Sequence, residues 1–199
     1  MKTLVILNGE CKNSCFLKEF SLNFDKIICA DGGYKYALDA GVVPDVVVGD
    51  FDSSFKPHGV KTVVYPADKD LSDAEIAIEY AKENFGGQVV MTCSLGKRLD
   101  HQIFNLFLLL KYKDLVIEEV DTIAFLCDKE MEFCGFENKT VSFLPIKNSN
   151  ISLSGFKYPL EYGDVKMGQT LTLSNIALND AKIIVNFGAV IAIINKTDI

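Results

Sequence analysis

Acidic side chains follow the apolar segments of this sequence. Asp31 comes directly after Ile27–Ala30, and Asp50 and Asp52 come after Asp45–Val48. Two further polar groups follow the next apolar segments, and their members are Asp68, Asp70, Asp73, Arg98, Asp100 and His101. In an open α/β sheet the carboxyl ends of parallel strands share one edge, and ligands bind there. We therefore expect these four groups to meet at one rim of a sheet.

Carboxylates that meet at one rim need a cation. Two carboxylates about 4 Å apart repel each other by roughly 4 kcal/mol at an effective dielectric near 20. Without a counter-ion some of them would stay protonated. Mg²⁺ favours carboxylate oxygens combined with substrate phosphates, so the rim predicts a magnesium–polyphosphate site. An Asp after a strand is also a common turn former or helix N-cap. That structural role could explain one of these groups, but it explains four groups at one rim less well.

Two glycine-containing loops support the same site. Asp31-Gly32-Gly33 lies between a predicted strand and a predicted helix, where glycine lets the backbone approach a ligand and a helix N-terminus attracts anions. The second loop, Ser94–Arg98, carries two cations, and Arg98 can clamp a phosphate oxygen. The sequence contains neither G-x-x-x-x-G-K-[ST] nor G-x-G-x-x-G, so a P-loop and a dinucleotide fingerprint are unsupported.

The first half alternates between strand and helix patterns. Strands are predicted over Lys2–Leu7, Lys26–Ala30, Asp45–Val48, Val60–Tyr65 and Gln88–Cys93, and helices over Phe16–Leu22, Tyr34–Ala40, from Ser72 to Gly86, and over Asp100–Tyr112. Ser72 and Glu75 fit a capping box. The Asp100–Tyr112 helix is apolar on most sides, and we favour a place in the core for it. The alternation predicts an α/β domain with a mostly parallel, doubly wound sheet.

The second half reads as short strands separated by Gly and Asn. They are predicted over Val116–Glu119, Thr122–Leu126, Glu130–Cys134, Thr140–Leu144, Ser149–Ser154, Thr170–Leu173 and Ile183–Asn186. This pattern is typical of an antiparallel sandwich or barrel. We place one domain at residues 1–118 and a second at residues 119–199.

Composition excludes several classes of protein. The formal net charge is −7, so the sequence lacks the basic footprint of a nucleic-acid-binding protein. The first apolar run, Lys2–Leu7, reads as a strand rather than a signal peptide, and no run approaches the roughly 20 residues that span a bilayer. The six cysteines form no C-x-x-C pair, and with two histidines they suggest neither a disulfide framework nor a zinc site. We expect a cytoplasmic protein with no membrane partner.

The motifs, in their order, resemble those of thiamine pyrophosphokinases. In the first half they are Cys29-Ala-Asp-Gly-Gly33, Pro44-Asp-Val-Val-Val-Gly-Asp-Phe-Asp-Ser53, Asp68-Lys-Asp-Leu-Ser-Asp73 and Gly96-Lys-Arg-Leu-Asp-His101. In the second half Val141–Ile146, Leu153–Leu160 and Ser174-Asn175 look like that family's C-terminal β domain. The resemblance covers nearly the whole chain.

The resemblance implies an ATP- and Mg²⁺-binding α/β domain, a thiamine-binding β-sandwich domain and a homodimer with thiamine at its interface. By matching position it implies a magnesium and polyphosphate group of Asp31, Asp50, Asp52 and Asp73. It further implies nucleotide contacts from Asp31, Gly32, Gly33, Lys69, Asp70, Arg98 and His101, a place for Asp100 at the reacting centre, and thiamine contacts from Ser174 and Asn175. The catalytic set is then Asp50, Asp52, Asp73, Arg98 and Asp100, with Asp100 also contacting the substrate.

The sequence departs from the family pattern at two places. Ile176 follows the Ser-Asn pair where an acidic residue is usual, and Lys97 follows Gly96 where a second glycine is frequent. The first departure bears on the thiamine contacts, and the second bears on the path of the loop. The chain contains no Trp, so any aromatic that stacks on thiamine would be Tyr or Phe.

The expected reaction is attack by the thiamine hydroxyl on the β-phosphorus of ATP, with AMP leaving. Such transfers depend on positioning and charge neutralisation, for which Arg98 is the candidate. Asp100 is the candidate that orients the hydroxyl or accepts its proton.

Two alternative functions stay open. Val46–Ser54 also resembles the D-x-D-x-[ST] element of haloacid-dehalogenase-type phosphatases, with Asp50 as nucleophile, and a non-catalytic nucleotide or thiamine sensor would use the same fold.

Overall fold

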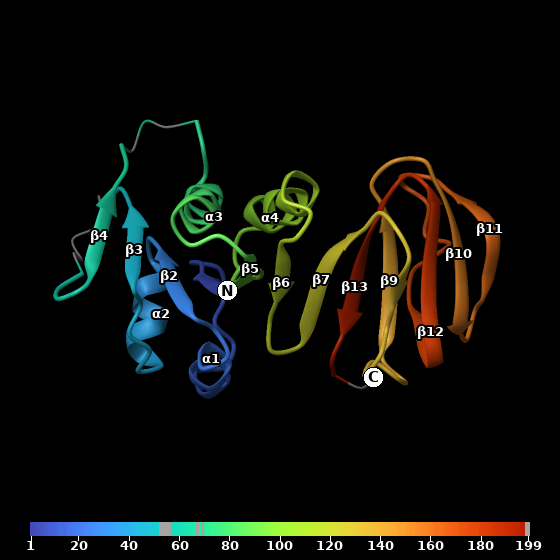
Figure 1. Ribbon diagram of the computed structural model, residues 1–199, viewed down its shortest axis with the longest axis horizontal. Coiled ribbons are helices and arrows are strands. Elements are labelled where there is room, and N and C mark those ends of the chain that lie inside the picture. The colour runs from blue at the N-terminus through green and yellow to red at the C-terminus, as the bar shows by residue number, and fades with distance from the viewer. Residues whose placement is uncertain (52–56, 67, 69, 198–199) are drawn as a thin grey trace. The chain divides into compact units, whose positions relative to one another are not determined.

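The computed structural model describes residues 1–51, 57–66, 68 and 70–197. Its backbone contacts divide the chain into two compact units, Met1–Val120 and Asp121–Ile199. Figure 1 shows both units, with most of their helices and strands labelled. Among the described residues, no helix is both long and apolar enough to cross a membrane.

The described part of the first unit contains a fully parallel sheet. Its strands, in spatial order, are β6 (Val116–Glu118), β5 (Gln88–Thr92), β1 (Lys2–Ile6), β2 (Lys26–Ala30), β3 (Val46–Gly49) and β4 (Lys61–Val64). The chain begins in the middle of the sheet, proceeds outward through β4, and returns to build β5 and β6 on the other side of β1. The order therefore reverses between β1 and β5, which is where open α/β sheets bind ligands.

Helices cover both faces of this sheet (Figure 1). They are α1 (Ser14–Ser21) and α2 (Gly33–Asp39) on one face, and α3 (Asp73–Asn84) and α4 (Leu99–Lys111) on the other. Leu4 and Ile6 of β1 share a buried cluster with Leu17 of α1 and Ala37 of α2. The predicted parallel sheet with helices on both faces is thus present in this unit.

The start of α3 forms half of the predicted capping box. The Ser72 side chain accepts a hydrogen bond from the Glu75 backbone N–H at 3.2 Å, which satisfies one of the helix's unpaired N–H groups. The Glu75 carboxylate instead accepts from Lys111 Nζ at 2.7 Å. Glu75 therefore ties α3 to α4, and Ser72 alone caps the helix with its side chain.

The predicted core position of α4 is correct for one of its faces. Leu108 and Leu109 are buried, whereas Phe104 and Phe107 are 68% and 50% exposed. The helix is apolar on most sides, so the sequence alone could not tell which of these side chains face the sheet.

The second unit is built from antiparallel strands. They are β7 (Thr122–Cys127), β8 (Met131–Glu132), β9 (Thr140–Pro145), β10 (Ser149–Phe156), β11 (Leu160–Val165), β12 (Asn175–Phe187) and β13 (Val190–Asn195). The core contains Phe133, Phe143 and Phe156, whose rings pack edge to face at 5.4–5.6 Å, the geometry that aromatic rings prefer.

The predicted strand over Thr170–Leu173 is wrong, because this segment is a turn. Its alternation comes from Thr172, which is buried and donates a hydrogen bond from Oγ1 to the Phe143 carbonyl, while Leu171 and Leu173 are exposed. One buried, hydrogen-bonded threonine between two exposed leucines therefore gives this turn the alternating burial of a strand. No strand was predicted over β11 or β13, and the predicted strand over Ile183–Asn186 covers only part of β12.

Thr3 provides a test of the packing in β1. Its side chain is fully buried, and its Oγ1 has no hydrogen-bond partner among the described residues. Burying an unpaired hydroxyl costs about 1–3 kcal/mol, so Thr3→Val should raise the free energy of unfolding by about 1 kcal/mol. The melting temperature should then rise by roughly 2–4 °C, as measured by calorimetry.

Thr172→Val is the matched control. It removes a buried hydroxyl that is hydrogen-bonded, so it should lower the melting temperature. A fall in melting temperature for Thr3→Val as well would contradict the assignment of Thr3 as an unsatisfied group.

Candidate active site

A pocket lies at the switch point of the parallel sheet. Its volume is about 560 Å³, and it is lined by the segments that follow β1, β2 and β5 and by the first turns of α3 and α4. The chain leaves β1 and β5 in different directions, because α1, which follows β1, and α4, which follows β5, lie on opposite faces of the sheet. This divergence opens a crevice between neighbouring strands.

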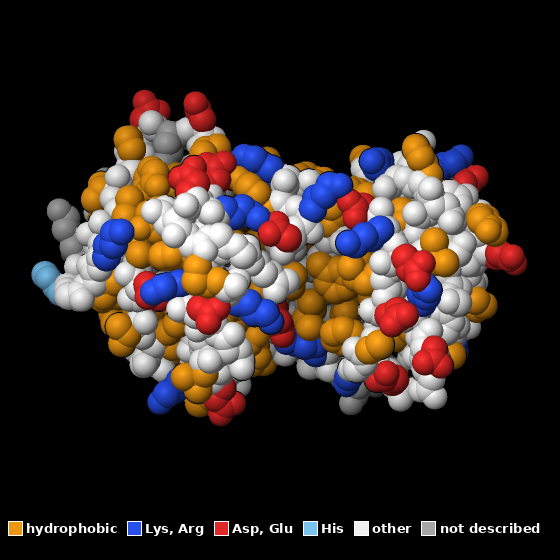
Figure 2. All heavy atoms as spheres, in the orientation of Figure 1, with side chains coloured by type: hydrophobic (Ala, Val, Ile, Leu, Met, Phe, Trp, Pro, Cys, Tyr) orange, Lys and Arg blue, Asp and Glu red, His pale blue; other side chains and the backbone are white. Residues whose placement is uncertain are grey.

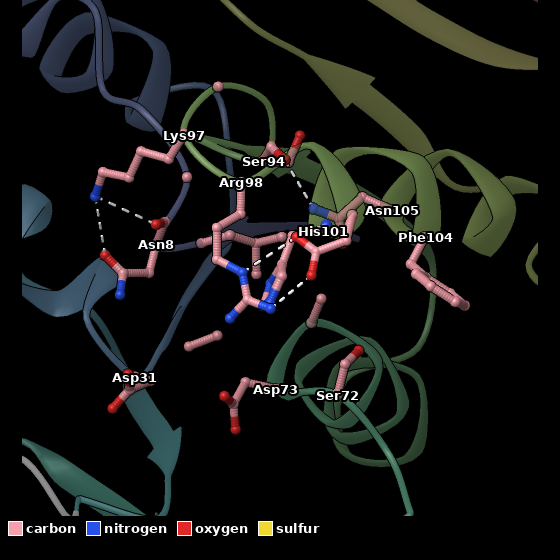
Figure 3. Close-up of a pocket in the computed structure, with 16 residues that line it drawn as sticks. Asn8, Asp31, Ser72, Asp73, Ser94, Lys97, Arg98, His101, Phe104 and Asn105 are labelled. Atoms are coloured by element: carbon pink, nitrogen blue, oxygen red, sulfur yellow. Dashed lines mark hydrogen bonds and ion pairs between the residues drawn. The ribbon is translucent and has the colours of Figure 1, made fainter.

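Five of the predicted site residues line this pocket: Asp31, Asp73, Arg98, Asp100 and His101. They come from three of the four groups that were expected to meet, so the structure brings these three groups together in one pocket. Figure 3 shows Asp31 and Asp73 on the side of the pocket opposite the loop and helix start that carry Lys97, Arg98 and His101. The pocket thus presents acidic groups on one side and basic groups on the other.

The other predicted residues that the structure describes are not part of the lining of this pocket. Asp50 follows Gly49, and a Cβ built on Gly49 would lie 3.3 Å from Cα of Asp31, so the backbone after β3 lies next to that after β2. Asp70 belongs to the segment between β4 and α3, where Figure 2 shows acidic side chains gathered. Asp52 and Lys69 fall outside the described residues. Ser174 and Asn175 belong to the second unit.

Backbone packing requires the second of the two glycines after Asp31. A Cβ on Gly33 would lie 2.2 Å from the Ile6 carbonyl oxygen, which is too short for any other residue. A Cβ on Gly32 would lie 2.4 Å from the Asn8 side chain, which would have to move. These glycines let α2 begin against the end of β1, and their contact with a nucleotide stays a prediction.

Arg98 and Asp100 form a bidentate ion pair at the mouth of the pocket. Arg98 Nε and Nη2 lie 3.1 Å and 2.5 Å from the two carboxylate oxygens of Asp100. The Arg98 guanidinium lowers the pKa of Asp100 to about 2, and the backbone N–H of His101 acts in the same direction. Asp100 is therefore a carboxylate at any physiological pH, and it holds a cation that a phosphate would also attract.

Lys97 is a pocket residue that was not among the predicted site residues. Its backbone is left-handed, with φ of 56°, and its Nζ donates to Tyr36 Oη at 2.5 Å. The same ammonium lies 3.4 Å from the side-chain and backbone oxygens of Asn8 (Figure 3). The sequence marks this position because Lys97 stands where the family frequently has glycine. Glycine is favoured there because the backbone is left-handed.

Within the described residues, no group of three or more His, Cys, Asp or Glu side chains is close enough to hold a metal ion by itself. Mg²⁺ is normally bound by one or two carboxylates together with substrate phosphates and water. Asp31 and Asp73 line one pocket, and that donor set suits a magnesium ion that arrives with a polyphosphate.

The fold and the pocket define a class: an α/β unit with a charged crevice at its switch point, followed by an antiparallel β unit. A family model described as "Thiamin pyrophosphokinase, catalytic domain" matches residues 17–119. A second, described as "Thiamin pyrophosphokinase, vitamin B1 binding domain", matches residues 122–191. The chain belongs to the thiamin pyrophosphokinase family, as its motifs predicted.

Individual relatives agree with this assignment. A thiamine pyrophosphokinase of Bacillus subtilis (strain 168) is 31% identical over 191 residues, which cover 88% of this chain and 89% of that protein. Among solved structures, a thiamine pyrophosphokinase from Bacillus subtilis superposes with a TM-score of 0.83 at 23% identity over 100% of both chains. One from Geobacillus thermodenitrificans gives a TM-score of 0.81 at 25% identity, covering 99% of this chain and 98% of that one.

The Arg98–Asp100 pair yields a prediction that is independent of activity. Arg98→Gln removes the main cause of the low pKa of Asp100, so this pKa should rise from about 2 toward the ordinary value near 3.9. Because the folded pKa is lowered, the pairing is fully present above the ordinary pKa and is lost as the pH falls through about 2. An NMR titration of the Asp100 carboxyl carbon measures the shift. An unchanged pKa in the variant would show that Arg98 does not pair with Asp100 in solution.

Proposed function

We propose that this chain transfers the pyrophosphoryl group of ATP to the hydroxyl of thiamine, giving thiamine diphosphate and AMP. The observation that carries the proposal is the match of the catalytic and the vitamin B1 binding family models, in order, along one chain. The pocket supports it, because Asp31, Asp73 and Arg98 meet there at the switch point of the sheet.

The ATP triphosphate is assigned to this pocket. Asp31 and Asp73, with Asp50 and Asp52, would hold Mg²⁺, which when bound neutralises charge on the phosphate oxygens. Arg98 and Lys97 would hold phosphate oxygens from the other side. Gly32, Gly33, Lys69, Asp70 and His101 remain in the proposed nucleotide-binding set.

Arg98 is assigned to the charge that develops on the transferred group. Its guanidinium is exposed and lies at the pocket mouth, so a phosphate can reach it without displacing protein from the core. When ATP is bound, the phosphate would share or replace the contact with Asp100.

Asp100 is assigned to orienting the thiamine hydroxyl. An effective general base has a pKa near the working pH, and the pKa of Asp100 is lowered to about 2 by Arg98. While Arg98 stays paired with it, Asp100 would therefore be a weak proton acceptor. As a fixed, fully ionised hydrogen-bond acceptor it can hold the hydroxyl in line with the β-phosphorus.

We assign ATP and magnesium to the first domain, residues 1–118, and thiamine binding and dimerisation to residues 119–199. Ser174 and Asn175 are the proposed thiamine contacts. Asn175 is buried, and its amide donates to the Tyr158 carbonyl at 2.7 Å and accepts from the Tyr158 N–H at 3.0 Å. The amide is thus occupied by the backbone of Tyr158, which favours Ser174 as the direct contact and Asn175 as its support.

A β-sandwich is the proposed architecture of the second domain. β12 pairs with β9 through Asn175 and Ile176, and further along it pairs with β10 and β8. The strands therefore fall into two groups that share β12. The aromatic core of this unit is what two facing sheets would enclose.

A homodimer and a cytoplasmic location belong to the same proposal. The apolar side chains exposed along α4, Leu99, Ile103, Phe104 and Phe107, are of the kind that marks interaction sites. All six cysteines are free, which suits a reducing compartment. Sedimentation velocity would separate a 22.0 kDa monomer from a dimer, and cell fractionation would test the location.

The proposed reaction is tested by following ATP labelled at the β-phosphorus. With thiamine and Mg²⁺ present, the label should appear in thiamine diphosphate, and AMP should form in equal amount. Without thiamine, AMP should not accumulate. A phosphatase of the haloacid-dehalogenase type would instead release phosphate from monoesters without thiamine, and a sensor would bind without forming AMP. Either of these outcomes would overturn the proposal.

Asp100→Asn tests the role of the carboxylate. The amide keeps the size of the side chain but presents a donor in place of one acceptor oxygen, so the hydroxyl loses its fixed partner. We expect kcat to fall roughly 100-fold, within the range for positioned catalytic groups, with little loss of ATP affinity. Steady-state kinetics and calorimetric ATP binding measure the two quantities.

The matched control is Asp39→Asn, the same change at an exposed position outside the pocket lining. It should leave kcat unchanged. Turnover by Asp100→Asn within twofold of the unmodified chain would exclude the orienting role.

A further inference from the structure

A buried carboxylate stands directly behind the pocket. Glu119 follows β6, and the whole residue is 7% exposed. Its oxygens accept from three consecutive backbone N–H groups: Ser94 N at 2.7 Å, Cys93 N at 3.0 Å and Leu95 N at 3.3 Å. The Ser94 hydroxyl lies 2.9 Å from the same carboxylate. Glu119 does not line the pocket, and the expected chemistry assigns it no role.

All of these partners can donate, so they suit the ionised form of Glu119. Burial raises the pKa of this carboxyl group, and the hydrogen bonds from Ser94, Cys93 and Leu95 oppose that rise. A buried carboxylate is retained only where its hydrogen bonds compensate for lost hydration. The contacts therefore bind residues 93–95 tightly to the end of β6.

The loop held in this way is strained. Cys93 and Lys97 have φ of 51° and 56°, and Gly96 has φ of 80°. Left-handed backbone is unfavourable for a residue with a side chain, so it persists only where the surroundings fix it. Asn105 of α4 provides a second attachment, because its side-chain amide donates to the Ser94 carbonyl at 2.7 Å.

The strained loop carries the basic side of the pocket. Lys97 and Arg98 follow residues 93–95 after a single glycine, and both line the pocket. If the backbone of residues 93–95 moves, the two cations move with it. Charge stabilisation in phosphoryl-type transfer depends on donors that are fixed before the reaction.

We propose that Glu119 is a positioning residue for the transfer reaction: its carboxylate fixes the backbone of residues 93–95 and thereby directs Lys97 and Arg98 at the phosphates. The proposal rests on the proposed function. Glu119 touches no reacting atom and acts through the loop.

Glu119→Gln is the direct test. It keeps size and shape but replaces one acceptor oxygen with an NH₂ group that faces N–H or O–H donors, so at least one of the loop contacts is lost. A misplacement of about 1 Å can cost roughly 100-fold in rate. We expect kcat to fall roughly 10- to 100-fold. The KM for thiamine should stay within about twofold, because Ser174 and Asn175, the proposed thiamine-binding pair, belong to the second unit.

Ile117→Val is the matched control for stability. Ile117 is fully buried in β6, two residues before Glu119, and loss of one methyl group destabilises the same strand. Its kcat should be unchanged when rates are normalised to the folded fraction. An equal fall in both variants would show that general destabilisation, and not positioning, controls the rate.

Amide hydrogen exchange supplies a readout that does not depend on turnover. In Glu119→Gln the amides of residues 93–95 should exchange at least tenfold faster, while those of β1 and β2 stay protected. Unchanged exchange at residues 93–95, or a kcat within twofold of the unmodified chain, would overturn the proposal. If the unmodified chain forms no AMP with thiamine, the proposed function fails, and the exchange result still decides whether Glu119 holds the loop.

Discussion

The parallel pairing of β1 with both β5 and β2 is the constraint on which the site depends. It places the ends of three strands side by side and sends the following chain to opposite faces of the sheet. The backbone there is packed so closely that side chains are excluded: a Cβ on Gly9 would lie 2.5 Å from the Cys93 carbonyl oxygen. The crevice is therefore rigid at its base, and its functional groups stand on loops around that base.

The two cations of the crevice each have a partner before any ligand binds. Arg98 pairs with Asp100, and Lys97 lies against Tyr36 and Asn8. A polyphosphate would exchange these contacts for stronger charge-assisted ones. The exchange is easiest where the pair is exposed, since an exposed ion pair contributes little to stability. Arg98 and Asp100 are exposed in this way, which makes them available to a ligand at small cost to the fold.

The sequence predicted the parts of this design that repeat. An apolar strand followed by an acidic residue occurs several times, so the parallel sheet and the meeting of Asp31, Asp73 and Asp100 could be predicted from pattern alone. The role of Glu119 could not be predicted. The sequence around a glutamate that follows a short strand does not show whether the side chain faces solvent or a loop 25 residues earlier in the chain. The turn around Thr172 was misread for a related reason: its pattern of burial arises from a contact with Phe143, far away in the chain.

Glu119 and Asn175 show how each unit holds its functional loop. The Asn175 amide donates to the Tyr158 carbonyl and accepts from the N–H groups of Tyr158 and Ile176, a mixed set that an amide can satisfy without charge. Glu119 faces three consecutive N–H groups, and an amide has only one acceptor atom to offer them. A carboxylate has two acceptor atoms and no donor, so it fits this set better despite the cost of burying its charge. The loop beside the proposed phosphate site is thus held by the stronger kind of contact, as expected where small displacements of a cation would change the reaction rate most.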